Sequence, residues 1–177
     1  FTIEYKIDGV ALALIYEDGV LVQALTRGDG ARGDDVLHNA RTVRGVPLRL
    51  NGDNLPSVIE VRGEALIFNS DFGTLRAEQE RKGEQLYANP RNTTSGALKL
   101  LDPKICAARR VRFLAHGMGY LAGGDFNSYT DYLAALRDFG VPPTPNVQTF
   151  VDLEEGQKQI QELMDGLHSL DFEVDGL

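Results

Sequence analysis

The sequence predicts an α+β fold in which antiparallel β-sheets are flanked by helices. Two apolar runs, residues 10–16 and 20–26, are separated by Glu17-Asp18-Gly19. An Asp-Gly turn between two such runs is typical of a β-hairpin. Later stretches carry helix caps and apolar residues at helical spacing, so we expect helices to pack around the sheet.

Composition indicates one soluble globular domain. The chain has 177 residues, of which 42% are hydrophobic and 25% are charged, enough for a single sizeable core. It begins without methionine inside a strand-like pattern, and residues 172–177 stop as another apolar run begins. We therefore expect residues 1–177 to be one domain that is truncated at both ends.

The sequence also indicates a cellular compartment. No apolar run is long enough to span a membrane, and no signal peptide opens the chain. Cys106 is the only cysteine, so it cannot form an internal disulfide, which favours a reducing compartment. We expect a cytoplasmic protein without a membrane partner.

The charge distribution bears on anionic partners. A net charge of −8 argues against general polyanion binding by this chain alone. Basic residues nevertheless cluster between Arg76 and Arg112, whereas only Arg137 and Lys158 follow. The cluster fits a local anion-binding surface, and it fits solvated helix faces equally well.

Residues 3–8 place a lysine within a strand-like run. Strand alternation sends Glu4, Lys6 and Asp8 to one face and the apolar side chains between them to the other. Gly9 then turns the chain into the hairpin, so we expect an antiparallel meander with Lys6 near its start. Lys6 can be an oriented nucleophile or a solvated member of an ion pair.

A glycine-rich loop at residues 26–35 follows the hairpin. Glycine allows positive φ and close backbone approach, so this loop can wrap a phosphate or form ordinary turns. Asp34 or Asp35 is expected to cap a short helix that runs through Val43 and is stopped by Val46-Pro47.

One strand and two helices are predicted next. Residues 57–67 alternate as a strand. Asn69 or Ser70 is expected to cap a helix that reaches about Lys82 and ends at Gly83. Asn89-Pro90 begins the next helix, which Pro103 is expected to stop.

The last third of the chain predicts one strand and two helices. Residues 111–120 form the strand, and Ser128 caps a helix whose apolar stripe is assigned to the core: Tyr129, Tyr132, Leu133 and Leu136. A capping box, Asp152-x-x-Glu155, opens the final helix. That helix is expected to bury Ile160, Leu163, Met164 and Leu167.

Five motifs occur in the order that is found in bacterial NAD-dependent DNA ligases. They are Glu4-Tyr5-Lys6-Ile7-Asp8-Gly9, Thr26-Arg27-Gly28-Asp29-Gly30 with Gly33-Asp34, Asn39-Ala40-Arg41-Thr42, Glu60-Val61-Arg62-Gly63-Glu64 and Ala88-Asn89-Pro90-Arg91-Asn92. The first contains the Lys-x-Asp-Gly signature of covalent nucleotidyltransferases. Together they make nearly the whole chain resemble the adenylation domain of such a ligase.

This resemblance implies a fold and a reaction. The fold is the ATP-grasp-like nucleotidyltransferase fold. Lys6 attacks NAD, releases nicotinamide mononucleotide and holds AMP, which passes to the 5′-phosphate of a DNA nick before the 3′-hydroxyl seals the strand. The resemblance further implies Mg²⁺ as cofactor, nicked double-stranded DNA as partner and a monomeric protein.

The resemblance also assigns roles to individual residues, without assigning a metal ligand. Lys6 and Asp8 are the catalytic residues. The cofactor-binding residues are Glu4, which contacts adenine, Arg27 and Glu64, which lie near the ribose, and His116, which lies against adenine. Arg91 and Lys99 are the phosphate- or DNA-binding residues. An alternative for His116 is a hydrogen-bonded strand histidine.

Two departures from the family pattern limit this expectation. Lys99 stands where some relatives carry an arginine, which would offer a bidentate fork. Asp175-Gly176-Leu177 resembles the start of an Asp-Gly-apolar-apolar-Lys motif that is cut before its lysine. We expect the fragment alone to adenylate poorly and not to seal nicks.

Two alternative functions stay open from the sequence. An ATP-dependent ligase or RNA-capping enzyme shares the Lys-x-Asp-Gly signature, although the motifs at Arg27 and Asn89 favour the NAD-dependent branch. A noncatalytic nucleic-acid-binding module is the second alternative, and the negative net charge argues against it.

Overall fold

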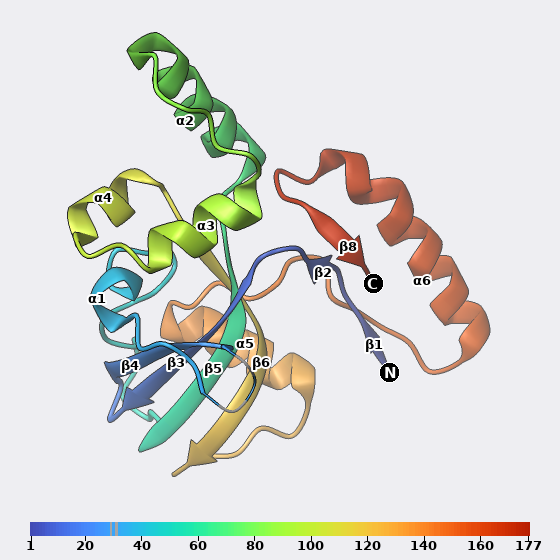
Figure 1. Cartoon of the computed structure of the whole chain (residues 1–177). Coiled ribbons are helices and arrows are strands. Elements are labelled where there is room, and N and C mark those ends of the chain that lie inside the picture. Colours follow the sequence, from blue (N-terminus) through green and yellow to red (C-terminus); the bar gives the residue numbers. More distant parts are fainter. Residues whose placement is uncertain (29, 31) are drawn as a thin grey trace.

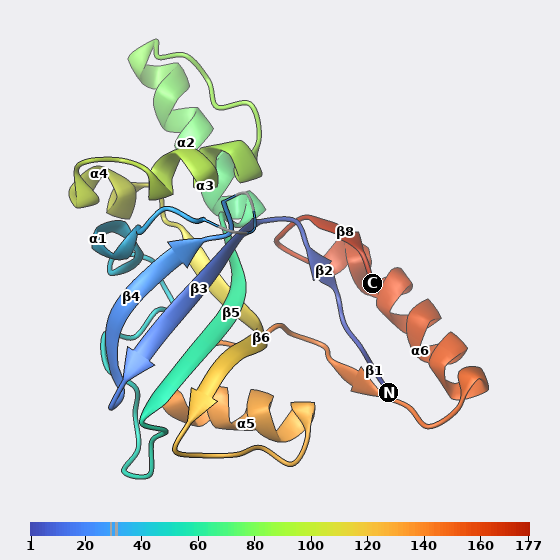
Figure 2. The ribbon, with the colours of Figure 1, turned by 60° about the horizontal axis from the view of Figure 1, so that its bottom comes forward.

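A curved, four-stranded antiparallel sheet forms the centre of the computed structural model, which describes residues 1–28, 30 and 32–177 (Figures 1 and 2). Its strands lie in the order β4-β3-β5-β6. Their bounds are Val20–Thr26 for β4, Val10–Glu17 for β3, Val58–Leu66 for β5 and Arg112–Ala122 for β6. The α+β expectation is thus confirmed.

The predicted hairpin is confirmed in detail. Strands β3 and β4 pair antiparallel, with Glu17 opposite Val20. Asp18 and Gly19 both adopt positive φ, 45° and 75°. This left-handed pair matches the twist of the flanking strands, as in a type I′ turn.

The remaining elements surround this sheet. The helices are α1 (Leu37–Ala40), α2 (Asn69–Lys82), α3 (Pro90–Leu98), α4 (Pro103–Ala108), α5 (Tyr129–Phe139), α6 (Leu153–Gly166) and the 3₁₀ turn η1 (Leu167–Ser169). The short strands are β1 (Thr2–Ile3), β2 (Lys6–Ile7), β7 (Gln148–Thr149) and β8 (Val174–Gly176). Figure 1 shows α1, α3 and α4 at one end of the sheet, with α6, β8 and both termini to one side. Side chains of α5 join the main core through Tyr132, Leu133 and Leu136.

The segment around Lys6 does not extend the hairpin, so the predicted meander is wrong. Strand β2 pairs antiparallel with β8, and β1 pairs with β7. Gly9 lies where the chain crosses from β2 to β3, and a Cβ there would be 2.7 Å from the carbonyl oxygen of Ala65. Glycine is required at this position because the two backbones pass so closely.

Most predicted helix ends are confirmed. The side chains of Asn89, Ser128 and Asp152 cap α3, α5 and α6. Gly83 and Gly140 end α2 and α5 with positive φ. These positions follow the known preferences for side-chain acceptors at N-caps and glycine at helix C-termini.

Two helix ends differ from the sequence prediction. Helix α1 ends at Ala40 rather than Val43, although the Asp35 carboxylate does accept from the amide of Leu37 at 2.9 Å. Helix α3 ends at Leu98, and Pro103 begins a separate helix, α4. Proline suits both roles because it cannot continue a helix and is favoured at the first helical position.

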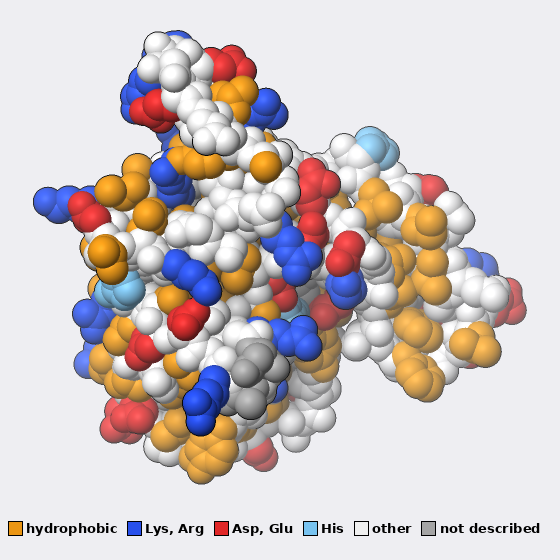
Figure 3. Space-filling view, viewed as in Figure 1, with side chains coloured by type: hydrophobic (Ala, Val, Ile, Leu, Met, Phe, Trp, Pro, Cys, Tyr) orange, Lys and Arg blue, Asp and Glu red, His pale blue; other side chains and the backbone are white. Residues whose placement is uncertain are grey.

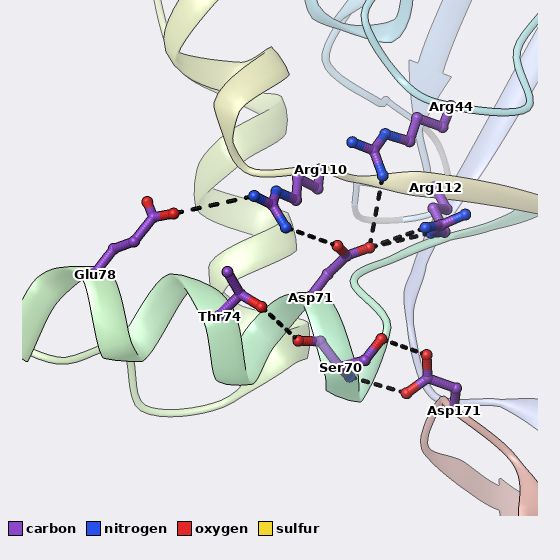
Figure 4. A network of polar contacts seen from close by, with 8 residues as sticks. All are labelled: Arg44, Ser70, Asp71, Thr74, Glu78, Arg110, Arg112 and Asp171. Carbon is purple, nitrogen blue, oxygen red and sulfur yellow. Dashed lines mark hydrogen bonds and ion pairs between the residues drawn. The ribbon is translucent and has the colours of Figure 1, made fainter.

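The start of α2 is capped from a distant part of the chain. The sequence predicted that Asn69 or Ser70 caps this helix, and this prediction is wrong, because the helix begins at Asn69 with no side-chain cap from either residue. Instead, the carboxylate of Asp171 accepts hydrogen bonds from the amide and the hydroxyl of Ser70, at 2.9 and 2.5 Å. This contact fastens the segment before β8 to α2 (Figure 4).

Asp71, also at the start of α2, is held by three arginines (Figure 4). Arg110 and Arg112 donate to its carboxylate at 3.0 to 3.3 Å, and Arg44 Nη1 lies 3.7 Å from Oδ2. Burial by itself would raise the pKa of Asp71, but the arginine hydrogen bonds and charges outweigh it and lower that pKa. The network joins α2, the start of β6 and the loop after α1.

Helix α6 buries less of its apolar face than the sequence predicted. Leu163 is buried, whereas Ile160, Met164 and Leu167 are 37%, 51% and 39% exposed. Figure 3 shows hydrophobic side chains on the surface of this part of the molecule. The helical spacing was correct, but the contacts of α6 with β1 and η1 in the described part of the chain leave these three side chains partly exposed. None of the described helices has the length and apolarity that crossing a membrane requires.

Candidate active site

A cleft of about 700 Å³ lies where β2 and β8 meet the main sheet and α3. Charged side chains of both signs surround this hollow in Figure 3. All eight residues that the sequence singled out line it: Glu4, Lys6, Asp8, Arg27, Glu64, Arg91, Lys99 and His116. Residues as far apart in the sequence as Glu4 and His116 therefore meet in one place.

Lys6 projects into the cleft from β2. Its neighbours Tyr5 and Ile7 are buried on the opposite face, so the predicted strand alternation is present. Lys6 pairs with Gly176 of β8, and its Nζ lies 2.5 Å from Asp175 Oδ1. The side chain is still 65% exposed, so the amine faces an open cleft while an ion pair restrains it.

Asp8 contacts Arg91 across the cleft. Arg91 Nη1 donates to Asp8 Oδ1 at 2.8 Å, and the amide of Asp8 donates to the carbonyl of Glu173 at 2.9 Å. Arg91 is the second residue of α3, directly after Pro90. The helix start therefore directs a guanidinium toward the carboxylate that follows Lys6.

The glycine-rich loop borders the same cleft through Arg27 and Gly28. Gly28 has φ of 53°, and a Cβ on it would lie 1.7 Å from the Arg32 carbonyl oxygen. The loop is therefore closed on itself and requires glycine there. Lys99 reaches the loop through an ion pair of 2.9 Å with Asp34. Asp29, which belongs to the predicted motif, lies outside the described residues.

Glu64 and His116 lie on adjacent strands, β5 and β6. His116 Nε2 is 3.6 Å from Glu64 Oε1. This carboxylate raises the pKa of His116, and it outweighs burial, which acts in the opposite direction. The imidazole thus combines a flat ring in the cleft with a tendency to carry positive charge near neutral pH.

Replacing Glu64 with glutamine is expected to lower the pKa of His116, because the main contribution that raises it is removed. In the parent chain, the pKa of His116 is expected to lie above 6.5. Any stabilisation of the fold by the His116–Glu64 pair is then expected to be complete below pH 6.5. It is expected to be lost as pH rises through the raised pKa of folded His116. NMR titration of the His116 ring protons measures this pKa. His38, which contacts the carbonyl of Leu100, is the internal control; equal His116 values in both proteins would contradict the assignment.

Glu4 enters the cleft from the segment between β1 and β2 and is held from behind by α5. The Tyr129 hydroxyl lies 2.7 Å from Glu4 Oε2 and 2.8 Å from the carbonyl oxygen of His116. Burial raises the pKa of Glu4, while the Tyr129 hydrogen bond and the charge of His116 oppose this rise. Glu4 and His116 are therefore neighbours at one end of the cleft.

Comparison with known protein families supplies an independent finding. A family described as "NAD-dependent DNA ligase adenylation domain" matches residues 1–177. The chain belongs to this family. Proteins named DNA ligase from Kocuria rhizophila, Rhodopirellula baltica and Magnetococcus marinus are 42%, 40% and 41% identical to it, and the matches cover 98%, 100% and 99% of the chain.

The match covers only part of those relatives. This adenylation-domain chain spans 23% to 26% of the length of the three ligases. The family resemblance that the sequence motifs indicated is confirmed over the whole chain, and the curated relatives are larger proteins.

Two side chains of this adenylation domain contact the predicted site residues without having been assigned to the site. Asp175 pairs with Lys6, and Tyr129 contacts Glu4. Asp175 had been noted only as part of a truncated motif, and Tyr129 had been assigned to an apolar core stripe. Tyr129 is only partly buried, and its hydroxyl provides the polar contact that helical spacing cannot reveal.

Proposed function

We propose that this chain is the adenylation domain of a longer NAD-dependent DNA ligase, that it has the nucleotidyltransferase fold, and that Lys6 carries the AMP. The observation that supports this most is the convergence of the eight predicted site residues on one cleft around Lys6. The family match over all 177 residues and the names of the longer relatives support it further.

The proposed first step is nucleophilic substitution at phosphorus. The neutral amine of Lys6 attacks the α-phosphorus of NAD, so that an N–P bond forms. The bond from this phosphorus to the bridging oxygen breaks, and nicotinamide mononucleotide leaves with the electron pair. An ammonium group has no free electron pair, so Lys6 must first lose a proton and leave its ion pair with Asp175.

The basic residues of the cleft are proposed to position the phosphates. Arg91 and Lys99 are each held by a carboxylate, Asp8 and Asp34 respectively. Both basic side chains are more than half exposed, so phosphate oxygens can compete for them at modest cost. Arg91 can bind bidentately, whereas Lys99 acts as a single charge.

Asp8 and Asp175 are the carboxylates that fit a Mg²⁺ ion. Both line the cleft together with Lys6, and Mg²⁺ is commonly bound by one or two carboxylates together with substrate phosphates and water. No group of three metal-ligating side chains occurs among the described residues, which agrees with a site that the substrate completes. The ion would neutralise charge on the reacting phosphate.

The later steps concern DNA. The AMP on Lys6 is proposed to pass to the 5′-phosphate of a nick, and the 3′-hydroxyl then displaces it to join the strands. We expect the longer ligase to perform both steps, as the names of the relatives suggest.

Intact-mass measurement of the full-length ligase after incubation with NAD and Mg²⁺ tests the proposal. We expect one added adenylyl group, located on Lys6 by peptide mapping, and sealing of a nicked duplex in a gel assay. Incubation with ATP is the control. Adduct formation from ATP but not from NAD would indicate an ATP-dependent enzyme, and nick binding without any adduct would indicate a noncatalytic module.

A further inference from the structure

Tyr129 and Tyr132 place two hydroxyl groups against consecutive residues of β6. Tyr132 donates to the carbonyl of Gly117 at 2.7 Å, and the Tyr129 hydroxyl lies 2.8 Å from the carbonyl of His116. Both tyrosines thus fasten α5 to the strand that carries His116. Within the described residues, only the Tyr129 hydroxyl has a second polar partner, Oε2 of Glu4 at 2.7 Å.

This second contact gives Tyr129 more acceptors than it can satisfy. A phenol hydroxyl has one hydrogen, and it can donate fully to either the carbonyl or the carboxylate. The Glu4 carboxylate is the stronger acceptor when it is ionised. No hydrogen bond within the described part of the chain reaches the other oxygen of Glu4, Oε1, although Glu4 lines the cleft.

We propose that Tyr129 is a positioning residue for base specificity: by donating to Oε2 it orients Glu4 so that Oε1 accepts a hydrogen bond from the amino group of a 6-aminopurine. This inference rests on the proposed function, in which the cleft binds NAD. Tyr129 is not among the described residues that line the cleft. It therefore acts through Glu4 rather than on the nucleotide.

An ionised carboxylate can accept hydrogen bonds but cannot donate one. It matches the amino group of adenine, whereas a 6-oxopurine such as hypoxanthine presents an oxygen at the same position. With hypoxanthine, the Glu4 carboxylate and the purine oxygen are both acceptors, so neither is paired. An unpaired polar group in a binding site discriminates strongly against the analogue. Burial raises the pKa of Glu4 and the Tyr129 hydrogen bond opposes that rise, so the hydroxyl also helps to keep Glu4 an acceptor.

The test compares NAD with nicotinamide hypoxanthine dinucleotide as substrates for self-adenylation of the full-length ligase. In Tyr129→Phe, the ratio of kcat/KM for NAD to that for the hypoxanthine analogue is expected to fall about tenfold or more, since a hydrogen bond to a charged group is lost. Tyr132→Phe is the matched control. It removes an equally short hydrogen bond, from the Tyr132 hydroxyl on α5 to the carbonyl of Gly117, which does not involve Glu4. The ratio of kcat/KM for NAD to that for the hypoxanthine analogue is expected to be unchanged in this variant.

A double-mutant cycle with Glu4→Gln shows whether Tyr129 acts through Glu4. Glu4→Gln is expected to lower the ratio by itself, because an amide can present either an acceptor or a donor. Adding Tyr129→Phe is then expected to cause no further fall. An unchanged ratio in Tyr129→Phe, or full base preference in Glu4→Gln, would overturn the inference. Full base preference in Glu4→Gln would overturn the inference even if Tyr129→Phe does not fold, because Tyr129 acts only through Glu4.

The proposed function and this inference fail in different ways. If the parent ligase forms no adduct with NAD, the proposed function fails. If the parent forms the adduct and Tyr129→Phe keeps the same base preference, the function stands and the role of Tyr129 is excluded. Thermal unfolding of Tyr129→Phe and Tyr132→Phe shows whether the two variants are comparably folded.

Discussion

Lys6→Ala is expected to abolish formation of the AMP adduct, with a loss of at least about a thousandfold, since a reaction through a covalent intermediate cannot proceed without its nucleophile. Lys6 lines the cleft and 65% of its side chain is exposed, so truncation removes little packing. Labelled NAD and detection of the labelled protein after denaturation measure the effect.

Lys99→Ala is the matched control for this variant. It also removes one lysine charge from the cleft, and its side chain is similarly exposed at 58%. It is expected to form the adduct more slowly, because a phosphate contact is lost while the nucleophile remains. Retention of label by Lys6→Ala, or equal loss in both variants, would contradict the assignment of Lys6.

Asp71→Ala is expected to cause the largest loss of stability among the changes considered, about 2–3 kcal/mol. Truncation leaves three arginines without their shared carboxylate, and breaking a buried pair costs about 3–5 kcal/mol. The estimate is lower because the arginine side chains are 34% to 50% exposed and partly screened by solvent. Urea denaturation measures the loss.

Glu78→Ala is the control for Asp71→Ala, because Glu78 lies 4.0 Å from the same Arg110, its one ion pair among the residues that the structure describes, and is 39% exposed. It is expected to change stability by less than about 1 kcal/mol. The pKa of Asp71 in the folded protein is lowered from 3.8. The contribution of Asp71 to folding stability is therefore complete above pH 3.8 and is lost as pH falls through the lowered pKa of the folded state. Equal destabilisation by both variants would argue against the network.

Local patterns predicted much of this fold. The Asp18-Gly19 turn and the glycines at helix ends were predicted correctly because their conformations depend on adjacent residues. The alternation around Lys6 also held, with Tyr5 and Ile7 buried behind it. The set of cleft residues came from ordered motifs rather than from periodicity.

Contacts between distant segments could not be predicted in the same way. Nothing near Asp171 indicates that it caps α2 about one hundred residues earlier. Helical spacing identified the apolar face of α6, but spacing does not reveal whether another element covers Met164. Tyr129 does pack against the main core as predicted, but its contact with Glu4 was not predicted, since an amphipathic side chain fits a core stripe and a polar contact equally well.

The pairing of β2 with β8 determines when the cleft can form during synthesis and folding of the chain. Lys6 and Asp175 are 169 positions apart, and β8 comes last among the elements. During synthesis, the ribosome must therefore release nearly all of this domain before the cleft can close, so a nascent chain would expose Lys6 without its partner. The amide of Asp8 donates to the carbonyl of Glu173, so pulsed hydrogen exchange during refolding should show that this amide is protected late. Early protection of the Asp8 amide would contradict this order of folding.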